Sequence, residues 1–244
     1  MLGRAFDKVQ RSYWRSADET RYAWQTQNAV VAPREAELAR RVVARAGERL
    51  LEIGCGEGAN LHHLREAGAV RFGVDYSGAR TAFARRATDA HTATADATRL
   101  PFADGAFDVV LIRDVLHHIA DVDGVLAEAR RVLRPGGRLT LLEPNRASRL
   151  ILLQAAVIPA ERGVLRSTAA ALEATLVRAG FRIVASAHEQ PFPLERVLLH
   201  PSFGLPSLAD HPLIARALTA ADAVARRLLP ERVWMYLVFE AIVP

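Results

Sequence analysis

Between residues 35 and 189, short continuous apolar runs alternate with longer segments in which apolar side chains recur every three to four positions. The short runs indicate strands buried on both faces, whereas the helical period indicates amphipathic helices. The predicted strands are 49–54, 70–75, 92–95, 107–112, 138–142, 181–187 and 233–243, and the predicted helices are 34–46, 59–67, 77–87, 122–133 and 168–179, with a turn at 134–137. This β-α repetition predicts an α/β fold with a doubly wound, mainly parallel sheet that binds ligands at the carboxyl ends of its strands.

The segment between the first predicted strand and the next helix carries the clearest chemical signal. Gly54, Gly56 and Gly58 are spaced two apart there, and Glu52 precedes them. Glycine lets the backbone of such a turn approach a ligand, and the following helix presents its free N–H groups to that ligand. The next strand ends in Asp75, where a carboxylate can accept hydrogen bonds from a ribose. We therefore expect a cofactor that contains a nucleoside.

Two nucleoside cofactors are compatible with this turn. The spacing Gly54-x-Gly56-x-x-Ala59 also satisfies the fingerprint of NAD-binding proteins. Glu52 favours S-adenosylmethionine, because a carboxylate at the cofactor's charged end suits an ammonium or sulfonium and repels a pyrophosphate. Gly58 would leave room for a compact amino-acid tail. An NAD-dependent oxidoreductase and an S-adenosylmethionine-binding protein without transferase activity are the alternatives.

Charged side chains collect at the predicted ends of the strands. They are Glu52, Asp75, Asp96, Arg113 and Glu143. Because the carboxyl ends of parallel strands meet at one edge of a sheet, these positions predict a single active-site rim.

Composition narrows the class of protein. Half of the 244 residues are hydrophobic, which suits one well-buried domain. We expect no stable membrane insertion, because no apolar run is long enough for a bilayer span and the polar N-terminus lacks a secretory hydrophobic region. Cys55 is the single cysteine, which fits a cytoplasmic location. The net charge is +5, but arginines are interleaved with acids along the helical patterns, so we expect no nucleic-acid partner.

Three segments fall outside the β-α repeat: 1–32, 146–166 and 190–230. The first two favour a substrate lid, and the third equally suits a lid or packing over exposed surface. The aromatic residues expected in the lid are Tyr13, Trp14, Tyr22 and Trp24. We expect one domain over 1–244, consisting of a helical cap (1–46), a cofactor-binding core (47–145) and a substrate-side half (146–244) with helical insertions at 146–166 and 190–230.

Several further motifs occur in a fixed order along the core. Leu-Glu-Ile-Gly-Cys-Gly-Glu-Gly at 51–58 is followed by Gly-Val-Asp-Tyr-Ser at 73–77 and by Ala-Asp-Ala-Thr-Arg-Leu-Pro-Phe at 95–102. Phe-Asp-Val-Val at 107–110, Leu-His-His-Ile at 116–119 and Arg-Val-Leu-Arg-Pro-Gly-Gly at 131–137 complete the series. This succession resembles the class I S-adenosylmethionine-dependent methyltransferases, in the small-molecule branch similar to the ubiquinone/menaquinone methyltransferases. The resemblance implies a Rossmann-like sheet of seven strands whose last strand is antiparallel.

The resemblance also implies S-adenosyl-L-methionine as the cofactor and a set of residues that bind it. The set comprises Glu52, Gly54, Gly56, Gly58, Asp75, Tyr76, Asp96, Ala97 and Arg113. Glu52 would hold the methionine ammonium, Asp75 would bind both ribose hydroxyls, and Tyr76 would pack on the adenine. Asp96 and the backbone of Ala97 would read the exocyclic amine of the adenine. Arg113 departs from the small or polar residue that is common in the family, and its side chain has no assigned role.

Two adjacent histidines are the candidate catalytic bases. Methyl transfer needs positioning above all, and a base only to deprotonate the acceptor. His117 and His118 follow the fourth strand, and a histidine with a pKa near neutrality suits that role. Adjacent residues on a helix point about 100° apart, so we expect only one of them to face the site, with Glu143 as orienter or second base. His62 and His63 are expected on the surface or in packing, and no metal-binding motif is evident.

The acceptor is expected to be a small, largely apolar molecule with a hydroxyl or an acidic carbon, such as a secondary metabolite or a quinone-like phenol. The segments that cover the rim contribute the four aromatic lid residues and the run Leu150, Ile151, Leu152 and Leu153. The Asn/Asp-Pro-Pro-aromatic motif of enzymes that methylate DNA adenine or protein glutamine is absent at 112–116, where the sequence reads Ile-Arg-Asp-Val-Leu. O-, C- and N-methylation all remain open, as do a monomer and a homodimer.

Overall fold

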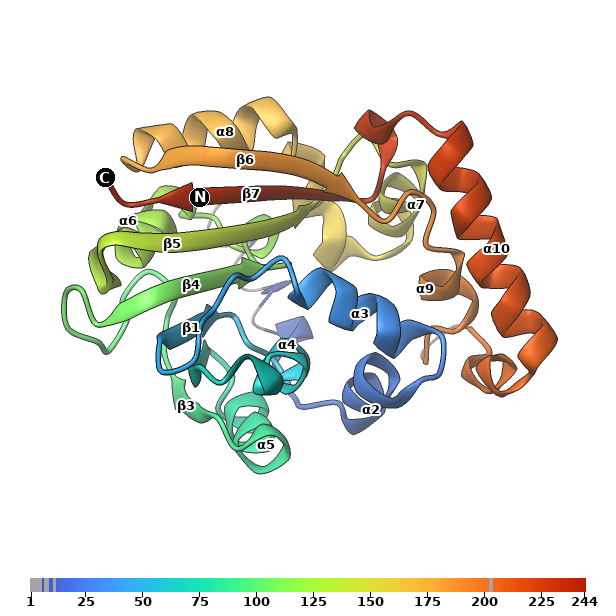
Figure 1. Ribbon diagram of the computed structural model, residues 1–244, viewed down its shortest axis with the longest axis horizontal. Coiled ribbons are helices and arrows are strands. Elements are labelled where there is room, and N and C mark those ends of the chain that lie inside the picture. The colour runs from blue at the N-terminus through green and yellow to red at the C-terminus, as the bar shows by residue number, and fades with distance from the viewer. Residues whose placement is uncertain (1–5, 7–8, 11, 202–203) are drawn as a thin grey trace.

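A seven-stranded sheet forms the centre of the computed structural model, which describes residues 6, 9–10, 12–201 and 204–244 (Figure 1). The strand order is β3-β2-β1-β4-β5-β7-β6. The strands are β1 (Arg49–Ile53), β2 (Val70–Asp75), β3 (His91–Thr94), β4 (Phe107–Arg113), β5 (Leu133–Pro144), β6 (Arg182–Glu189) and β7 (Tyr236–Ile242). β1 to β5 are parallel, and β7 runs antiparallel between β5 and β6. The predicted doubly wound, seven-stranded fold is therefore confirmed.

Helices cover both faces of the sheet. Those of the core are α3 (Val31–Ala39), α4 (Ala59–His63), α5 (Gly78–Thr88), α6 (Val122–Val132) and α8 (Ala169–Arg178), and η1 (Arg65–Ala67) and η2 (Leu116–His118) are short 3₁₀ helices. Alternate residues of a strand point to opposite faces. Val110 and Ile112 of β4 accordingly pack with α6 and α8, whereas Val109 and Leu111 pack with α3, α4 and α7 (Arg149–Val157).

Several predicted boundaries differ from the structure: the helix expected at 59–67 divides into α4 and η1, and the strand expected at 233–243 begins at Tyr236. The helix expected at 34–46 begins earlier and ends at Ala39, because the chain turns back into β1 through residues 40–48. The turn expected at 134–137 lies within β5 as a bulge, since Phe107 pairs with Leu133 but Val109 pairs with Arg138. Backbone hydrogen bonds between this bulge and Val243 stabilise it, so a distant strand overrides the local turn signal.

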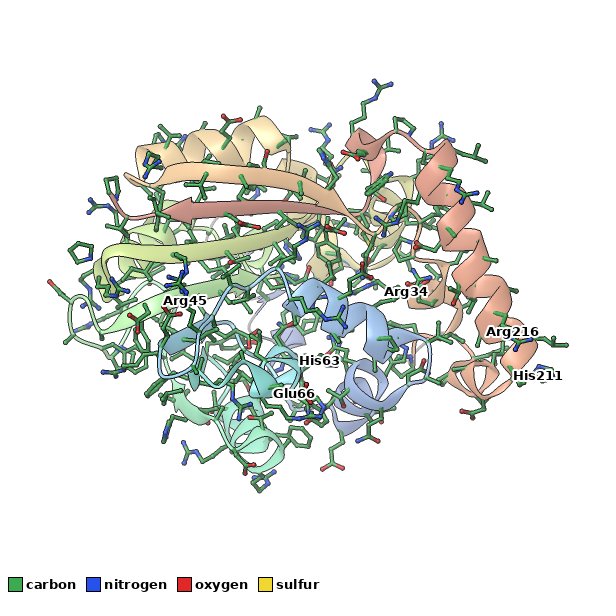
Figure 2. The ribbon with its side chains drawn as sticks, viewed as in Figure 1. Arg34, Arg45, His63, Glu66, His211 and Arg216 are labelled. Atoms are coloured by element: carbon green, nitrogen blue, oxygen red, sulfur yellow. The ribbon has the colours of Figure 1, made fainter. Side chains whose placement is uncertain are left out.

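A helical cap lies at the carboxyl ends of the parallel strands. It consists of α2 (Glu19–Gln27), α7, α9 (Leu194–Leu198) and α10 (Pro212–Leu228), together with the 3₁₀ helices η3 (Pro159–Arg166), η4 (Pro206–Asp210) and η5 (Glu231–Val233) (Figure 1). Trp24 and Val31 share a small apolar cluster with Leu199 and Leu218, so the N-terminal helices and the 190–230 insertion form one packed unit. Arg34, which is labelled between α3 and α10 in Figure 2, pairs with Asp222 at 3.0 Å.

No helix of the described ranges is long and apolar enough to cross a membrane.

Candidate active site

A cavity of about 690 Å³ lies between the carboxyl ends of the strands and the cap. Its walls come from the glycine turn after β1, the ends of β2 and β4, and the cap elements α2, α7, η3 and α9. A cavity of this size falls within the range of small-molecule sites. Of the five charged residues predicted at the strand ends, Glu52, Asp75, Asp96 and Arg113 line this cavity, and Glu143 does not.

Glu52 is buried at the end of β1, on the cavity wall. Asn60 Nδ2 donates to its Oε1 at 2.6 Å, but its Oε2 has no hydrogen-bond partner in the described part of the chain. Burial raises the pKa of this carboxyl to about 8. A buried acceptor without a donor is costly, so the position suits a cationic ligand group that completes its contacts.

Asp75 ends β2 beside the same turn. Gly56 N donates to its Oδ2 at 3.1 Å and Ser77 N donates to its Oδ1 at 2.9 Å, and burial raises the pKa of its carboxyl. Each carboxylate oxygen accepts one backbone bond and has a second lone pair for a ligand hydroxyl. Gly54 lines the cavity with Gly56, and a methyl group at Gly54 would meet Val115 at 2.3 Å.

Gly58 does not serve the purpose expected for it. Its φ is 86°, and a methyl group there would meet Thr88 at 2.9 Å and Ala84 at 3.1 Å. Because both neighbours belong to α5, this glycine allows the turn to pack against a helix and does not line the cavity.

Tyr76, Asp96 and Ala97 lie together on the cavity wall, as the resemblance implied. The hydroxyl of Tyr76 donates to the carbonyl of Gln10 at 3.3 Å. Asp96 Oδ1 accepts hydrogen bonds from the backbone N and the hydroxyl of Thr98 at 3.0 and 2.8 Å, which fixes this carboxylate at the rim.

The side chain of Arg113 donates hydrogen bonds to residues of two different helices, α4 and α3. Its NH1 donates to Asn60 Oδ1 and its NH2 to Glu35 Oε2, both at 2.7 Å. Glu35 also accepts a hydrogen bond from Arg196 of α9. A continuous buried chain of contacts therefore runs from Glu52 to the cap. The sequence did not point to Asn60, Glu35 or Arg196, because they belong to three elements that only the fold brings together.

The aromatic lid residues divide into two groups. Trp14 and Trp24 line the cavity, whereas Tyr13 is 52% exposed and lies outside its lining. Tyr22 is also misassigned to the lid, because its hydroxyl contacts His62 Nδ1 at 3.2 Å and it packs on Phe83. α2 presents successive residues to different sides, so only one of its two aromatic residues faces the cavity.

The expected packing role of the histidines on α4 agrees with their contacts. Besides the contact with Tyr22, His62 lies beside Arg65, and His63 Nε2 contacts the carbonyl of Gln25 at 3.0 Å (Figure 2).

Glu57 ties the N-terminal cap to the cofactor turn. Arg80 donates to both of its carboxylate oxygens, at 2.9 and 2.7 Å, and the backbone N of Asp18 donates to it at 3.1 Å. The guanidinium groups of Arg80 and Arg21 both lie over the ring of Trp14, at 5.1 and 4.6 Å from its centroid. The cap is therefore held over the turn by charge as well as by apolar packing.

His117 and Glu143 form a fully buried pair. His117 Nδ1 lies 2.7 Å from Glu143 Oε2, and Glu143 also accepts the backbone N–H groups of Val115, Leu116 and His117. Glu143 is not on the cavity wall, which suits an orienting role and not that of a second base. Burial lowers the pKa of His117, but Glu143 and Glu161 outweigh burial and raise it to about 10.

His118 has the opposite electrostatic environment. Burial and the neighbouring His117 hold its pKa well below the ordinary value, and its Nδ1 has no hydrogen-bond partner among the described residues. The expectation of a pKa near neutrality is therefore wrong for both histidines. Both also line the cavity, contrary to expectation, since they belong to the 3₁₀ helix η2 with ring centroids 3.8 Å apart.

The wall opposite the cofactor turn is less uniformly apolar than expected. Leu150, Ile151 and Leu153 of α7 line the cavity, but Leu152 points away from it. Charged and polar side chains interrupt the apolar surface, namely Arg21, Glu161, Arg196 and His200. The sequence pattern could not show these residues on the wall, because they come from three separate segments of the cap: α2, η3, and α9 with the residues directly after it.

Residues 51–141 match the family model of a methyltransferase domain. The chain contains a methyltransferase domain. The matched residues run from β1 to β5 and include the glycine turn, Asp75 and both cavity histidines. The resemblance to the class I S-adenosylmethionine-dependent methyltransferases is thereby confirmed.

Two curated relatives and one solved structure extend this match. A demethylmenaquinone methyltransferase of Beutenbergia cavernae is 42% identical over 101 residues, covering 41% of this chain and 42% of the relative. A 27-O-demethylrifamycin SV methyltransferase of Amycolatopsis mediterranei is 38% identical over 133 residues, covering 48% of each. The chain thus spans less than half the length of these relatives.

The solved structure of a geranyl diphosphate C-methyltransferase from Streptomyces coelicolor A3(2), in complex with Mg²⁺, geranyl diphosphate and S-adenosyl-L-homocysteine, has a TM-score of 0.65. It is 15% identical, and the match covers 98% of both chains. At this identity the similarity concerns the fold, which extends through the cap.

Proposed function

We propose that this chain transfers a methyl group from S-adenosyl-L-methionine to a hydroxyl or a carbon of a small, largely apolar molecule. The proposal rests on two carboxylates at the ends of adjacent strands in the methyltransferase domain. Glu52 has a buried oxygen without a hydrogen-bond partner among the described residues, which suits an ammonium group, and Asp75 has two oxygens that can accept hydrogen bonds from a ribose. A pyrophosphate beside Glu52 would be repelled, which disfavours NAD.

The cofactor supplies an electrophilic methyl group on a sulfonium that is already a good leaving group. The protein must hold the acceptor in line and exclude water. We assign the second task to the cap, because its Trp14 and Trp24 line the cavity. The proton of an acceptor hydroxyl would leave near His117, His118 and Glu161, which line the same cavity.

The class of acceptor follows from the wall and from the names of the relatives. Leu150, Ile151 and Leu153 suit a flat or apolar body, and the relatives are named for a menaquinone precursor and a rifamycin precursor. A quinone-like phenol or a secondary metabolite with a few polar substituents is therefore the proposed acceptor. We further propose that the enzyme is cytoplasmic, has no nucleic-acid partner and acts as a monomer or a homodimer.

Calorimetry followed by an acceptor screen tests this function. S-adenosyl-L-homocysteine should bind with a stoichiometry of one per chain, and formation of this product from S-adenosyl-L-methionine should require a phenol from a panel of quinols and aromatic polyketides. Binding without turnover on any acceptor would favour the S-adenosylmethionine-binding alternative. Binding of NADH in place of S-adenosyl-L-homocysteine would identify an oxidoreductase and refute the proposal.

A further inference from the structure

Three potential metal ligands meet at one point of the cavity wall. The ligand atoms of His117, His118 and Glu161 all lie within 4.8 Å of one another. Glu161 comes from η3 and the histidines from η2, so only the fold brings them together. We propose that His117, His118 and Glu161 form a binding site for a divalent transition-metal ion, best suited to Zn²⁺.

The distance between His117 and Glu161, which form an ion pair in the structure, also fits two ligands of one metal ion. Nε2 of His117 lies 3.5 Å from Oε2 of Glu161, which is long for a hydrogen bond. Two ligand atoms about 2.0–2.2 Å from a tetrahedral zinc ion lie about 3.4 Å apart. The pair therefore already has the separation of two ligands on one ion.

His118 supplies the second, independent observation. Its Nδ1 is buried and has no hydrogen-bond partner in the described part of the chain, although its ring also interacts with the backbone of Ala160. An unpartnered imidazole nitrogen in a buried cluster is costly, and a metal ion would satisfy it. The ring of His118 is close enough to the other two residues for all three ligand atoms to lie within 4.8 Å of one another.

The surrounding groups match the outer shell of a metal site. A metal-bound histidine commonly donates its second ring N–H to a carboxylate or a backbone carbonyl. Glu143 occupies that position on Nδ1 of His117, at 2.7 Å, and leaves Nε2 for the ion. The carboxylates of Glu143 and Glu161 together balance the charge of a divalent cation.

Gly163 allows the close packing of η3 on η2 that brings Glu161 near the two histidines. A methyl group at Gly163 would lie 1.6 Å from the carbonyl oxygen of His117, so the absence of a side chain lets η3 approach η2 closely. This close packing sets Glu161 opposite His117.

Three protein ligands leave at least one coordination position open to the cavity. Two imidazoles and one carboxylate favour zinc and other first-row transition metals over Mg²⁺, which prefers oxygen ligands. In this position the ion would bind an acceptor hydroxyl and lower its pKa, a use of the site that rests on the proposed function. The hydroxyl proton would pass to water as the new C–O bond forms and the S–C bond of the cofactor breaks.

Cobalt spectroscopy and zinc calorimetry on metal-stripped protein test the site. Co²⁺ should give d–d absorption bands that saturate at one ion per chain, Zn²⁺ should remove them, and Mg²⁺ should not. His118→Ala and Glu161→Gln should each weaken Zn²⁺ binding at least about 10-fold. His211→Ala is the matched control, since His211 is exposed at the start of α10 and should leave binding unchanged (Figure 2).

Absence of a saturable cobalt spectrum, or a spectrum unchanged in both ligand variants, would overturn the metal site. Binding of S-adenosyl-L-homocysteine is measured on the same samples to show that the variants are folded. If wild type bound the metal but no S-adenosyl-L-homocysteine, the proposed function would fail while the metal site stood. The reverse result would remove the metal site alone.

Discussion

Glu143 joins His117 to the backbone that positions it. One of its oxygens lies 2.7 Å from His117 Nδ1, and the other accepts the N–H groups of Val115 and Leu116 at 2.9 and 2.8 Å. A single buried carboxylate at the end of β5 thus stabilises the first turn of η2 and orients the imidazole that follows. This relationship ties the segment after β4 to the end of β5.

Replacement of Asp75 by alanine should abolish most of the affinity for S-adenosyl-L-homocysteine. Loss of its two charged hydrogen bonds to a ribose should weaken binding roughly 10²- to 10⁴-fold, since each such bond contributes roughly 1.5–3 kcal/mol. Calorimetry measures the change, and Asp123→Ala, an exposed acid on α6, is the control. Binding by Asp75→Ala equal to that of wild type would show that the ribose lies elsewhere.

Affinity for S-adenosyl-L-homocysteine should fall as the pH is lowered from about 8 to about 6. The pKa of Glu52 is raised to about 8, chiefly by burial, so the empty site is protonated below that pH. Pairing with a ligand ammonium requires the carboxylate, and binding must therefore release a proton in this range.

The matching variant is Glu52→Gln, which should bind more weakly than wild type and show a flatter pH dependence. Calorimetric titrations at several pH values give both curves. An equally steep curve for Glu52→Gln would assign the pH dependence to another group.

Replacement of His118 by alanine should lower turnover roughly 10²- to 10⁴-fold and leave S-adenosyl-L-homocysteine affinity nearly unchanged. Because the pKa of His118 is held well below its ordinary value and that of His117 is raised to about 10, neither should produce a rise in rate between about pH 6 and pH 8. Steady-state kinetics across this range measure both features. Full activity of the variant would exclude His118 from catalysis and leave positioning as the source of the rate.

Gly163→Ala should destabilise the protein by roughly 1–3 kcal/mol, because a methyl group cannot fit against the carbonyl oxygen of His117. Denaturant unfolding measures the loss, and turnover should fall as η3 moves away from η2. Gly78→Ala is a suitable control, since a methyl group there would meet only Thr94, at 3.5 Å. Equal stability of the two variants would contradict the close packing seen here.

Ligand binding should protect the N-terminal cap from trypsin. Two hydrogen bonds hold the segment between Arg15 and Arg21 near the cofactor turn. Ser77 Oγ donates to the carbonyl of Arg15, and the backbone N of Asp18 donates to Glu57. Cleavage at the two arginines should slow when S-adenosyl-L-homocysteine is added, because ligand contacts restrain local opening. A cleavage rate that does not depend on ligand would mean that the segment packs on the core without acting as a lid.

Local sequence patterns were sufficient to predict the strands of the sheet and the part of the cavity wall formed by the glycine turn after β1. The end of a buried strand and the glycine turn after it are encoded within about ten neighbouring residues, so Glu52, Gly54 and Gly56 could be assigned to the wall before the fold was known. The same patterns failed at Gly58, whose close neighbours Ala84 and Thr88 lie on α5.

The amino-acid sequence by itself determined the α/β class, the strands and the approximate place of the site, because periodicity and strand ends are local properties. Only the tertiary structure decided which side chains of the cap face the cavity, as the separation of Trp24 from Tyr22 shows. It also decided the direction in which the pKa of each histidine shifts. Glu143 and Glu161 approach His117 from different elements and raise its pKa, whereas burial and the neighbouring His117 lower the pKa of His118. Electrostatic interactions depend on distance in space, which the order of residues along the chain does not specify.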